Sequence, residues 1–203
     1  MYWSIARRRS WLARVGSLLV IAGIMACESE RPPSTFYPVD SLVTAQIKLL
    51  ARLNARLEKK ALLGGKEDAA EYRPADTTAW QKELDIFRQL DNINKPVNRN
   101  SYEITDGLQD PGSNLLIREF KCIDEQPIVY LRIYYQGTLA RPRKLEALYR
   151  EANPMFKSTR QLSMRLDQVG EETVLTAYSV HGGQKMMLSD SVSYQISGKI
   201  LFD

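Results

Sequence analysis

The last hundred residues of the chain are divided by turn signals into short segments in which apolar and polar residues alternate. Alternation with a period of two places successive side chains on opposite faces of a strand. The clearest segment is 128–135, in which Val129, Leu131, Ile133 and Tyr135 share one face. Regularly spaced turn signals between such segments predict an antiparallel meander of roughly seven strands.

The strand boundaries follow from the turn residues Gly, Pro, Asn and Asp. Residues 144–151 have helical propensity, but their apolar residues alternate, so a strand is favoured there. Asp106–Gly107 and His181–Gly182–Gly183 are predicted to be turns. The expected strands are 102–105, 115–122, 128–135, 144–151, 156–167, 173–180, 184–188 and 192–202.

Two helices are expected before the strands. The first is predicted to start after Asp40 as its N-cap and to run to about Leu63, where Gly64–Gly65 ends it. Leucines at three-, four- and seven-residue steps form its apolar stripe. The polar residues 66–73 are expected to form a loop.

A second helix is predicted from Asp76 or Thr77 to Asn92, with an apolar stripe that includes Trp80 and Leu84. Helices followed by consecutive strands indicate an α+β fold, in which a two-helix hairpin packs on a curved antiparallel sheet. The expected single domain covers 39–203, with the helical hairpin over 39–93 and the sheet over 101–203.

The start of the chain has a different character. Arg7, Arg8, Arg9 and Arg14 precede the apolar run Val15–Cys27. A basic start followed by a short apolar run is typical of a secretory signal peptide, here over 1–26. The run is too short for a stable membrane-spanning helix, which needs about 20 residues.

The end of this run, Ile24–Met25–Ala26–Cys27, resembles the lipobox of bacterial lipoproteins. The resemblance implies that Cys27 is acylated, as by palmitate, and becomes the first residue of a membrane-anchored envelope protein. An ordinary signal peptide cut elsewhere, or an uncleaved anchor, remains an alternative. The charged, Pro-rich residues 27–38 are expected to form a flexible tether.

The residues after Cys27 bear on the location. In some bacterial lipoproteins an Asp at the next position marks retention in the inner membrane, and this chain has Glu28 there instead. The family analogy therefore favours the outer membrane. Glu28 and Glu30 also resemble the acidic export signals of surface-displayed lipoproteins in the Bacteroidota, although a solvated acidic spacer explains them more simply.

The net charge of +4 belongs to the leader. Residues 1–26 contain four Arg, no Lys and no acid, so 28 − 4 = 24 basic and 24 acidic residues remain in the processed chain. A nucleic-acid partner is not expected, because phosphate backbones require a concentrated positive surface.

Catalytic chemistry finds little support in the sequence. His181 is the sole histidine, and the sequence has no nucleophile motif of a hydrolase that could act with it. Cys122 is expected to be a small buried strand residue. One histidine and one cysteine predict neither a metal site nor a cofactor. Met186 and Met187 are expected in the core. The acids predicted in turns are Asp106, Asp110, Asp124, Glu125, Glu171 and Glu172.

The remaining candidate site is the second face of the 128–135 strand. Tyr130, Arg132 and Tyr134 alternate there, and rings around an arginine can bind a sugar or a protein. The leading hypothesis is a non-enzymatic binding or assembly module of the envelope. The alternatives are a carrier of lipid or another hydrophobic ligand between sheet and helices and, less favoured, a hydrolase that uses loop carboxylates.

Overall fold

The computed structural model describes residues 36–169, 172–187 and 190–202. The predicted leader over 1–26, the acylation site Cys27, most of the tether over 27–38 and the turn acid Glu171 lie outside these residues. The described residues form a mostly β body, in which nine antiparallel strands make one sheet and two α-helices accompany it.

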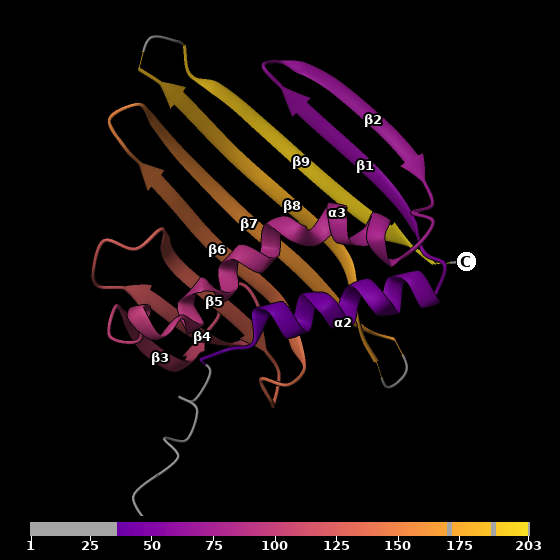
Figure 1. Cartoon of the computed structure of the whole chain (residues 1–203). Helices are drawn as coiled ribbons and strands as arrows, with labels where there is room; N and C mark the ends of the chain where they lie inside the picture. Colours follow the sequence, from indigo (N-terminus) through magenta and orange to yellow (C-terminus); the bar gives the residue numbers. More distant parts are fainter. Residues whose placement is uncertain (1–35, 170–171, 188–189, 203) are drawn as a thin grey trace, which may run out of the picture. The chain divides into compact units, whose positions relative to one another are not determined.

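The sheet has more strands than the sequence predicts. Its order is β2-β1-β9-β8-β7-β6-β5-β4-β3, so β3 to β9 form a meander and the β1–β2 hairpin joins at β9 (Figure 1). The strands are β1 Arg56–Leu63, β2 Lys66–Tyr72, β3 Tyr102–Gln109, β4 Leu116–Cys122, β5 Ile128–Tyr135, β6 Pro142–Ala152, β7 Phe156–Val169, β8 Glu172–Met186 and β9 Val192–Leu201.

The first helix is shorter than expected. Helix α2 covers Val39–Arg52, and Asn54 then takes a left-handed backbone conformation with φ 52°. The N–H of Ala55 donates to the carbonyl of Leu50, which closes the helix end in a Schellman-type turn. Asparagine tolerates this conformation better than most residues, so Asn54, and not Gly64, ends the helix.

The residues after α2 form a hairpin of strands. The predicted continuation of the helix over 56–63 is wrong, because β1 pairs along its length with both β2 and β9. Gly64 and Gly65 have φ of 55° and 83°, as a two-residue hairpin turn requires. The predicted loop 66–73 is the edge strand β2, whose exposed charged side chains discourage pairing with another chain.

The second helix matches its prediction closely. Helix α3 covers Thr77–Arg88 and continues as 3-10 turns over Gln89–Asn94 and Pro96–Asn98. The Asp76 side chain caps it by accepting from the N–H of Ala79 at 2.8 Å. The two helices contact each other. The β1–β2 hairpin lies between them in the chain, so residues 39–93 are not the purely helical hairpin that the sequence predicts.

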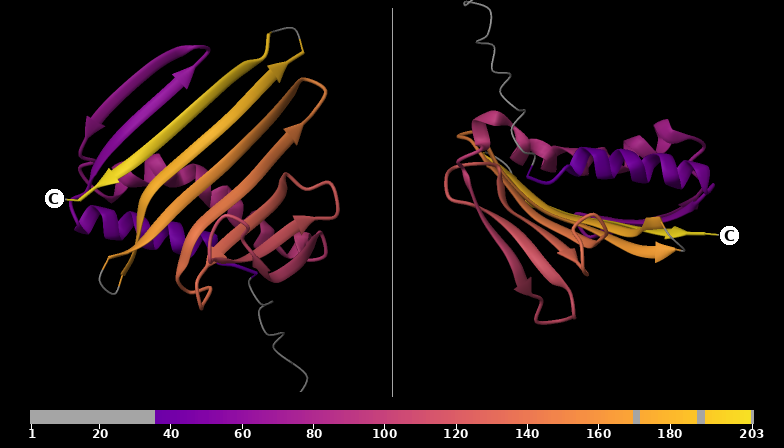
Figure 2. Two further views of the ribbon diagram at one scale, coloured as in Figure 1. Left: turned by 180° about the vertical axis from the view of Figure 1, so that it is seen from behind. Right: turned by 90° about the horizontal axis from the view of Figure 1, so that it is seen from below.

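Both helices cover the same face of the sheet, and they lie side by side across the strands (Figures 1 and 2). The core fills the space between them and the sheet. Trp80, Leu84 and Phe87 of α3 are fully buried against this face. On the sheet side, alternating residues such as Leu131 and Ile133 complete the core, as the 128–135 pattern predicts.

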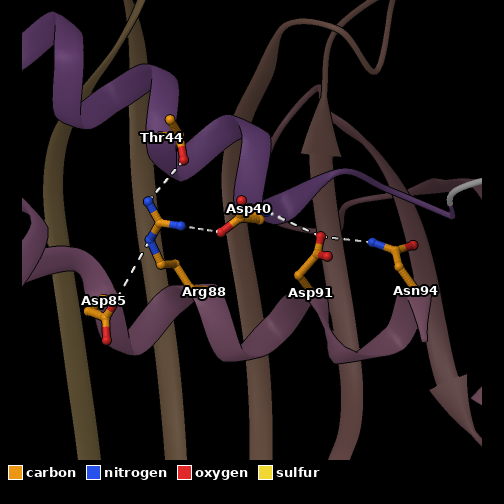
Figure 3. A network of polar contacts seen from close by, with 6 residues as sticks. All are labelled: Asp40, Thr44, Asp85, Arg88, Asp91 and Asn94. Atoms are coloured by element: carbon orange, nitrogen blue, oxygen red, sulfur yellow. Dashed lines mark hydrogen bonds and ion pairs between the residues drawn. The ribbon is translucent and has the colours of Figure 1, made fainter.

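Polar contacts join the start of α2 to the end of α3 (Figure 3). Arg88 donates to Asp40 at 2.5 Å and to Thr44 at 3.0 Å. Asp91 accepts from the backbone N–H of Asp40 at 3.2 Å and from Asn94 at 2.8 Å. Asp40 is therefore not the N-cap. It lies in the first turn, and the cap comes from Asp91 of the neighbouring segment.

The predicted turn at 181–183 is also wrong, because β8 runs without a break through these residues. Two glycines make room for tyrosine rings on the helix side. An added Cβ at Gly182 would lie 2.5 Å from the Tyr194 ring, and one at Gly198 would lie 2.3 Å from the Tyr178 ring. Here glycine provides space for a neighbouring side chain rather than a chain reversal.

A half-buried carboxylate, that of Glu83, connects α3 to the sheet. Glu83 accepts from Lys59 at 2.7 Å, from Tyr72 at 2.7 Å and from Tyr178 at 2.9 Å. Burial by itself raises the pKa of Glu83, but these hydrogen bonds outweigh it, so the pKa lies below its ordinary value. Burial and the bond to Glu83 raise the pKa of Tyr72 to about 12.

Candidate functional site: the open face of the sheet

The face of the sheet opposite the helices, here called the open face, is not covered by any element of the described residues (Figure 2). Alternation along each strand decides which side chains reach it. On β5 these are Tyr130, Arg132 and Tyr134, the three residues singled out in the sequence. The strand alternation predicted for 128–135 thus places them together on a solvent-facing sheet surface.

Arg132 is held by neighbours on both sides. Its Nε donates to Glu119 of β4 at 2.6 Å. Its guanidinium lies 4.6 Å from the centre of the Tyr130 ring, within the range of a cation–π contact. Both Arg132 and Tyr130 remain half-exposed, so a planar cation and an aromatic ring are presented to solvent in a fixed arrangement.

Tyr134 is less accessible than its neighbours, with an exposed fraction of 7%. Its hydroxyl donates to Glu146 of β6 at 2.6 Å, and Lys144 pairs with the same carboxylate at 2.5 Å. Burial raises the pKa of Glu146, but the bonds from Lys144 and Tyr134 lower it below its ordinary value overall. Tyr134 therefore helps to hold the Glu146 side chain in place and exposes little of its ring to a ligand.

A cross-strand row connects this cluster to the other half of the open face. Arg132 lies opposite Glu146, and Glu146 lies opposite Ser163 of β7. Ser163 lies opposite Ser179 of β8, which in turn lies opposite Ser197 of β9. Three serines thus stand side by side on neighbouring strands, about 4.8 Å apart.

The open face is hollowed at this serine row. A cavity of about 380 Å³ is open to solvent there, and its lining includes Ser163, Ser179, Ser197 and Ala177. These four side chains are small, so they form a low floor between longer neighbours. We call this depression, with Lys60, Arg165 and Lys199 at its sides, the serine hollow.

Positive charges surround the serine hollow. Arg165 and Lys199 lie on either side of Ala177 in one cross-strand row, and both are exposed. Among the described residues neither forms an ion pair. Lys60 pairs with Glu58 at 3.4 Å. The charged side chains that line the hollow are thus three cations and one acid.

The sequence gives little sign of this hollow. Ser163, Ser179 and Ser197 lie far apart in the chain, and small polar residues on an exposed strand face are common. Only the register of β7, β8 and β9 makes them neighbours. A β-bulge between Arg165 and Leu166 shifts that register, and a bulge leaves a weak signal in a single sequence.

The acids predicted in turns do not form one constellation, and two of them lie in strands, Asp106 in β3 and Glu172 at the start of β8. Asp106 accepts from Arg118 and from Tyr135 at 2.8 Å, and the bond from Arg118 lowers the pKa of Asp106. Glu172 pairs with Arg52 of α2 at 2.5 Å. Within the described ranges, no group of three or more His, Cys, Asp or Glu side chains could hold a metal ion.

The other residues considered from the sequence have ordinary surroundings. His181 lies in β8 between Gln161 and Gln195 on the open face and is exposed. Cys122 ends β4, is only half-buried, and its thiol donates to the carbonyl of Asp124 at 2.7 Å. Met186 and Met187 are 56% and 68% exposed, so their expected core position is wrong.

Comparisons with known proteins found no matching family model, curated protein or solved structure. Neither α-helix in the described part of the chain combines the length and apolar character that crossing a membrane requires.

Proposed function

We propose that this chain is a lipid-anchored protein of the bacterial cell envelope, held through Cys27, whose body is a non-enzymatic binding module. Its partner or ligand contacts the open face of the sheet. The location rests on the resemblance of the leader to lipoprotein signal peptides. The binding role rests on the structure of the open face.

One observation carries the binding role. The serine hollow gathers three hydroxyls and two cations that have no polar side-chain partner among the described residues. Elsewhere, charged side chains such as Arg132 and Arg88 are paired with carboxylates. Polar groups that converge on a depression without satisfying one another are available to a bound molecule.

The other two hypotheses find less support. A carrier needs space between helices and sheet, whereas Trp80, Leu84 and Phe87 occupy that space and are fully buried. A hydrolase needs two carboxylates in one depression. Glu58 is the one carboxylate that lines the serine hollow. A second hollow, beside α2, is likewise lined by a single carboxylate, that of Glu172.

Site-specific photo-crosslinking in living cells tests the proposal. A crosslinking amino acid at Gln161, exposed on the open face beside the serine hollow, is compared with one at Gln81, exposed on α3. We expect a discrete adduct from Gln161 and none from Gln81. The double exchange Tyr130→Ala and Arg132→Ala should weaken that adduct if the partner extends across β5.

The outcome against the proposal is equally clear. Adducts of the same kind from Gln81 and Gln161 would indicate unspecific contacts in a crowded envelope. An adduct from Gln81 alone would place the partner on the helix layer, and the binding role of the open face would then be wrong.

A further inference from the structure

We infer that the serine hollow binds a phosphate monoester group, with Arg165 and Lys199 as the charged contacts and the serine hydroxyls as further donors. This inference rests on the proposed binding role of the open face and names the chemistry of what is bound there.

The hydroxyls define the base of the site. Ser163, Ser179 and Ser197 are half-buried, and within the described residues their hydroxyls make no hydrogen bond to another side chain or to the backbone. Strand spacing places them about 4.8 Å apart along one line. A hydroxyl can donate to an anionic oxygen, so two adjacent serines can bind oxygens of one tetrahedral group.

The charges decide the sign of the bound group. Arg165 and Lys199 flank Ala177, the smallest side chain of the hollow's floor, from the two neighbouring strands. Both side chains are long enough to turn over Ala177 toward a common point. Two acids adjoin the hollow, and each has a cation as its partner. Glu58, opposite Lys199, pairs with Lys60, and Glu146, opposite Ser163, pairs with Lys144. Arg165 and Lys199 form no ion pair among the described residues and lie above a row of donors, an arrangement that favours an anion, and guanidinium geometry suits phosphate oxygens.

The size of the hollow limits what fits. Its volume of about 380 Å³ lies at the lower end of the range of about 300–1,000 Å³ for small-molecule sites. A phosphate monoester with one small organic group matches this volume. The same chemistry is present in a sugar phosphate and in the headgroup of phosphatidic acid, so the experiment must separate a soluble source from a lipid source.

Calorimetric titration of the purified full chain in non-ionic detergent provides the test. The probes are glucose 6-phosphate, inorganic phosphate and uncharged glucose. Vesicle flotation uses the full chain with Cys27→Ala, which lacks the proposed lipid, and compares phosphatidic acid in phosphatidylcholine with phosphatidylcholine alone. We expect saturable binding of at least one phosphate monoester and none of glucose. Each exchange Arg165→Gln and Lys199→Gln should weaken binding about tenfold, as loss of a charge-assisted hydrogen bond does.

Two further variants control this experiment. Lys82→Gln makes the same change of charge on α3, where Lys82 is exposed, and should leave binding unchanged. Ser179→Leu fills the floor of the hollow and should abolish binding of phosphate monoesters. Because Arg165, Lys199 and Lys82 are all exposed, these exchanges should keep the fold, which circular dichroism and thermal unfolding verify.

The results separate the inference from the proposed function. Binding of glucose 6-phosphate without vesicles assigns a soluble source, and binding of vesicles alone assigns the headgroup. Equal binding by the Arg165→Gln, Lys199→Gln double variant, equal binding of glucose, or no saturable binding of any phosphate probe overturns the inference. If the adduct from Gln161 persists in those cases, the binding module stands and only the anion assignment fails.

Discussion

At the scale of single residues, Gly198 shows why a side chain can be absent for a structural reason. The Tyr178 ring, only 5% exposed, occupies the position above Gly198 on the helix side. Its hydroxyl in turn donates to Glu83. The missing side chain of Gly198 thus allows a ring of β8 to reach a carboxylate of α3.

The exchange Gly198→Ala should therefore destabilise the protein. Its new Cβ would lie 2.3 Å from a Tyr178 ring carbon, and relieving such overlap in a packed interior costs about 1–3 kcal/mol. Urea unfolding measures the loss. The matched control is Gly183→Ala, where the nearest atom is 3.8 Å away; equal losses for both variants would contradict this account.

Glu83 should make stability depend on pH. Because its folded pKa lies below the ordinary value of 4.5, its stabilising contribution is complete above that value and is lost as the pH falls through the folded pKa. Glu83→Gln should lose about 1–3 kcal/mol near neutral pH and show a shallower decline in acid. Unfolding free energies measured between pH 3 and pH 7 test this, and parallel curves would refute it.

At the scale of elements, a side chain of helix α2 forms hydrogen bonds with the backbone of β8 at a point where β8 has no neighbouring strand on one side. The Gln46 side chain is almost fully buried, donates to the carbonyl of Thr173 at 2.9 Å and accepts from the N–H of Leu175 at 2.7 Å. The register between β8 and β9 starts only at Ala177. Gln46 therefore takes the place of a neighbouring strand where β9 does not pair.

Gln46→Leu should be costly, because the buried N–H of Leu175 and the part-buried carbonyl of Thr173 would lose their partner. The expected loss of unfolding free energy is about 1–3 kcal/mol for each unsatisfied group, and hydrogen exchange at Leu175 should accelerate. Gln81→Leu makes the same exchange on an exposed face and should change stability by less than about 0.5 kcal/mol. Unchanged exchange at Leu175 in Gln46→Leu would rule out this role.

Periodicity in the sequence predicts some elements well and others poorly. The 128–135 strand and α3 are correct because each has one buried face, so the apolar residues repeat with a clear period. Residues 56–63 fail because their leucines, lysines and alanine favour a helix locally. Pairing with β9, more than a hundred residues away, overrides that preference, and no local pattern encodes it.

The candidate site divides in the same way. The alternation of Tyr130, Arg132 and Tyr134 is visible in the sequence, and the three share a face as expected. The burial of Tyr134 and the serine hollow depend on which strands are neighbours. Strand order and register are tertiary facts, so these parts could be found only in the folded molecule.

At the scale of the whole molecule, the proposed attachment of the body to a membrane rests on Cys27. Cys27→Ala should abolish acylation, because the proposed anchor is a lipid carried on this thiol. The protein should then move from the detergent phase to the aqueous phase in phase separation. Intact-mass measurement of the native protein should show a chain that begins at Cys27 with a diacylglycerol mass. Retention of residues 1–26, or another first residue without lipid, would contradict the anchor.

The strand order also ties the first hairpin of the body to its last strand. Arg56 of β1 lies opposite Leu201 of β9, while β2 has β1 as its one neighbour in the sheet. The hairpins from β3 to β9 can close locally, one after another, whereas docking of β1 must bridge most of the polypeptide. Such distant pairing slows folding. A chain that emerges from its amino end therefore cannot dock its first hairpin until β9 has also emerged.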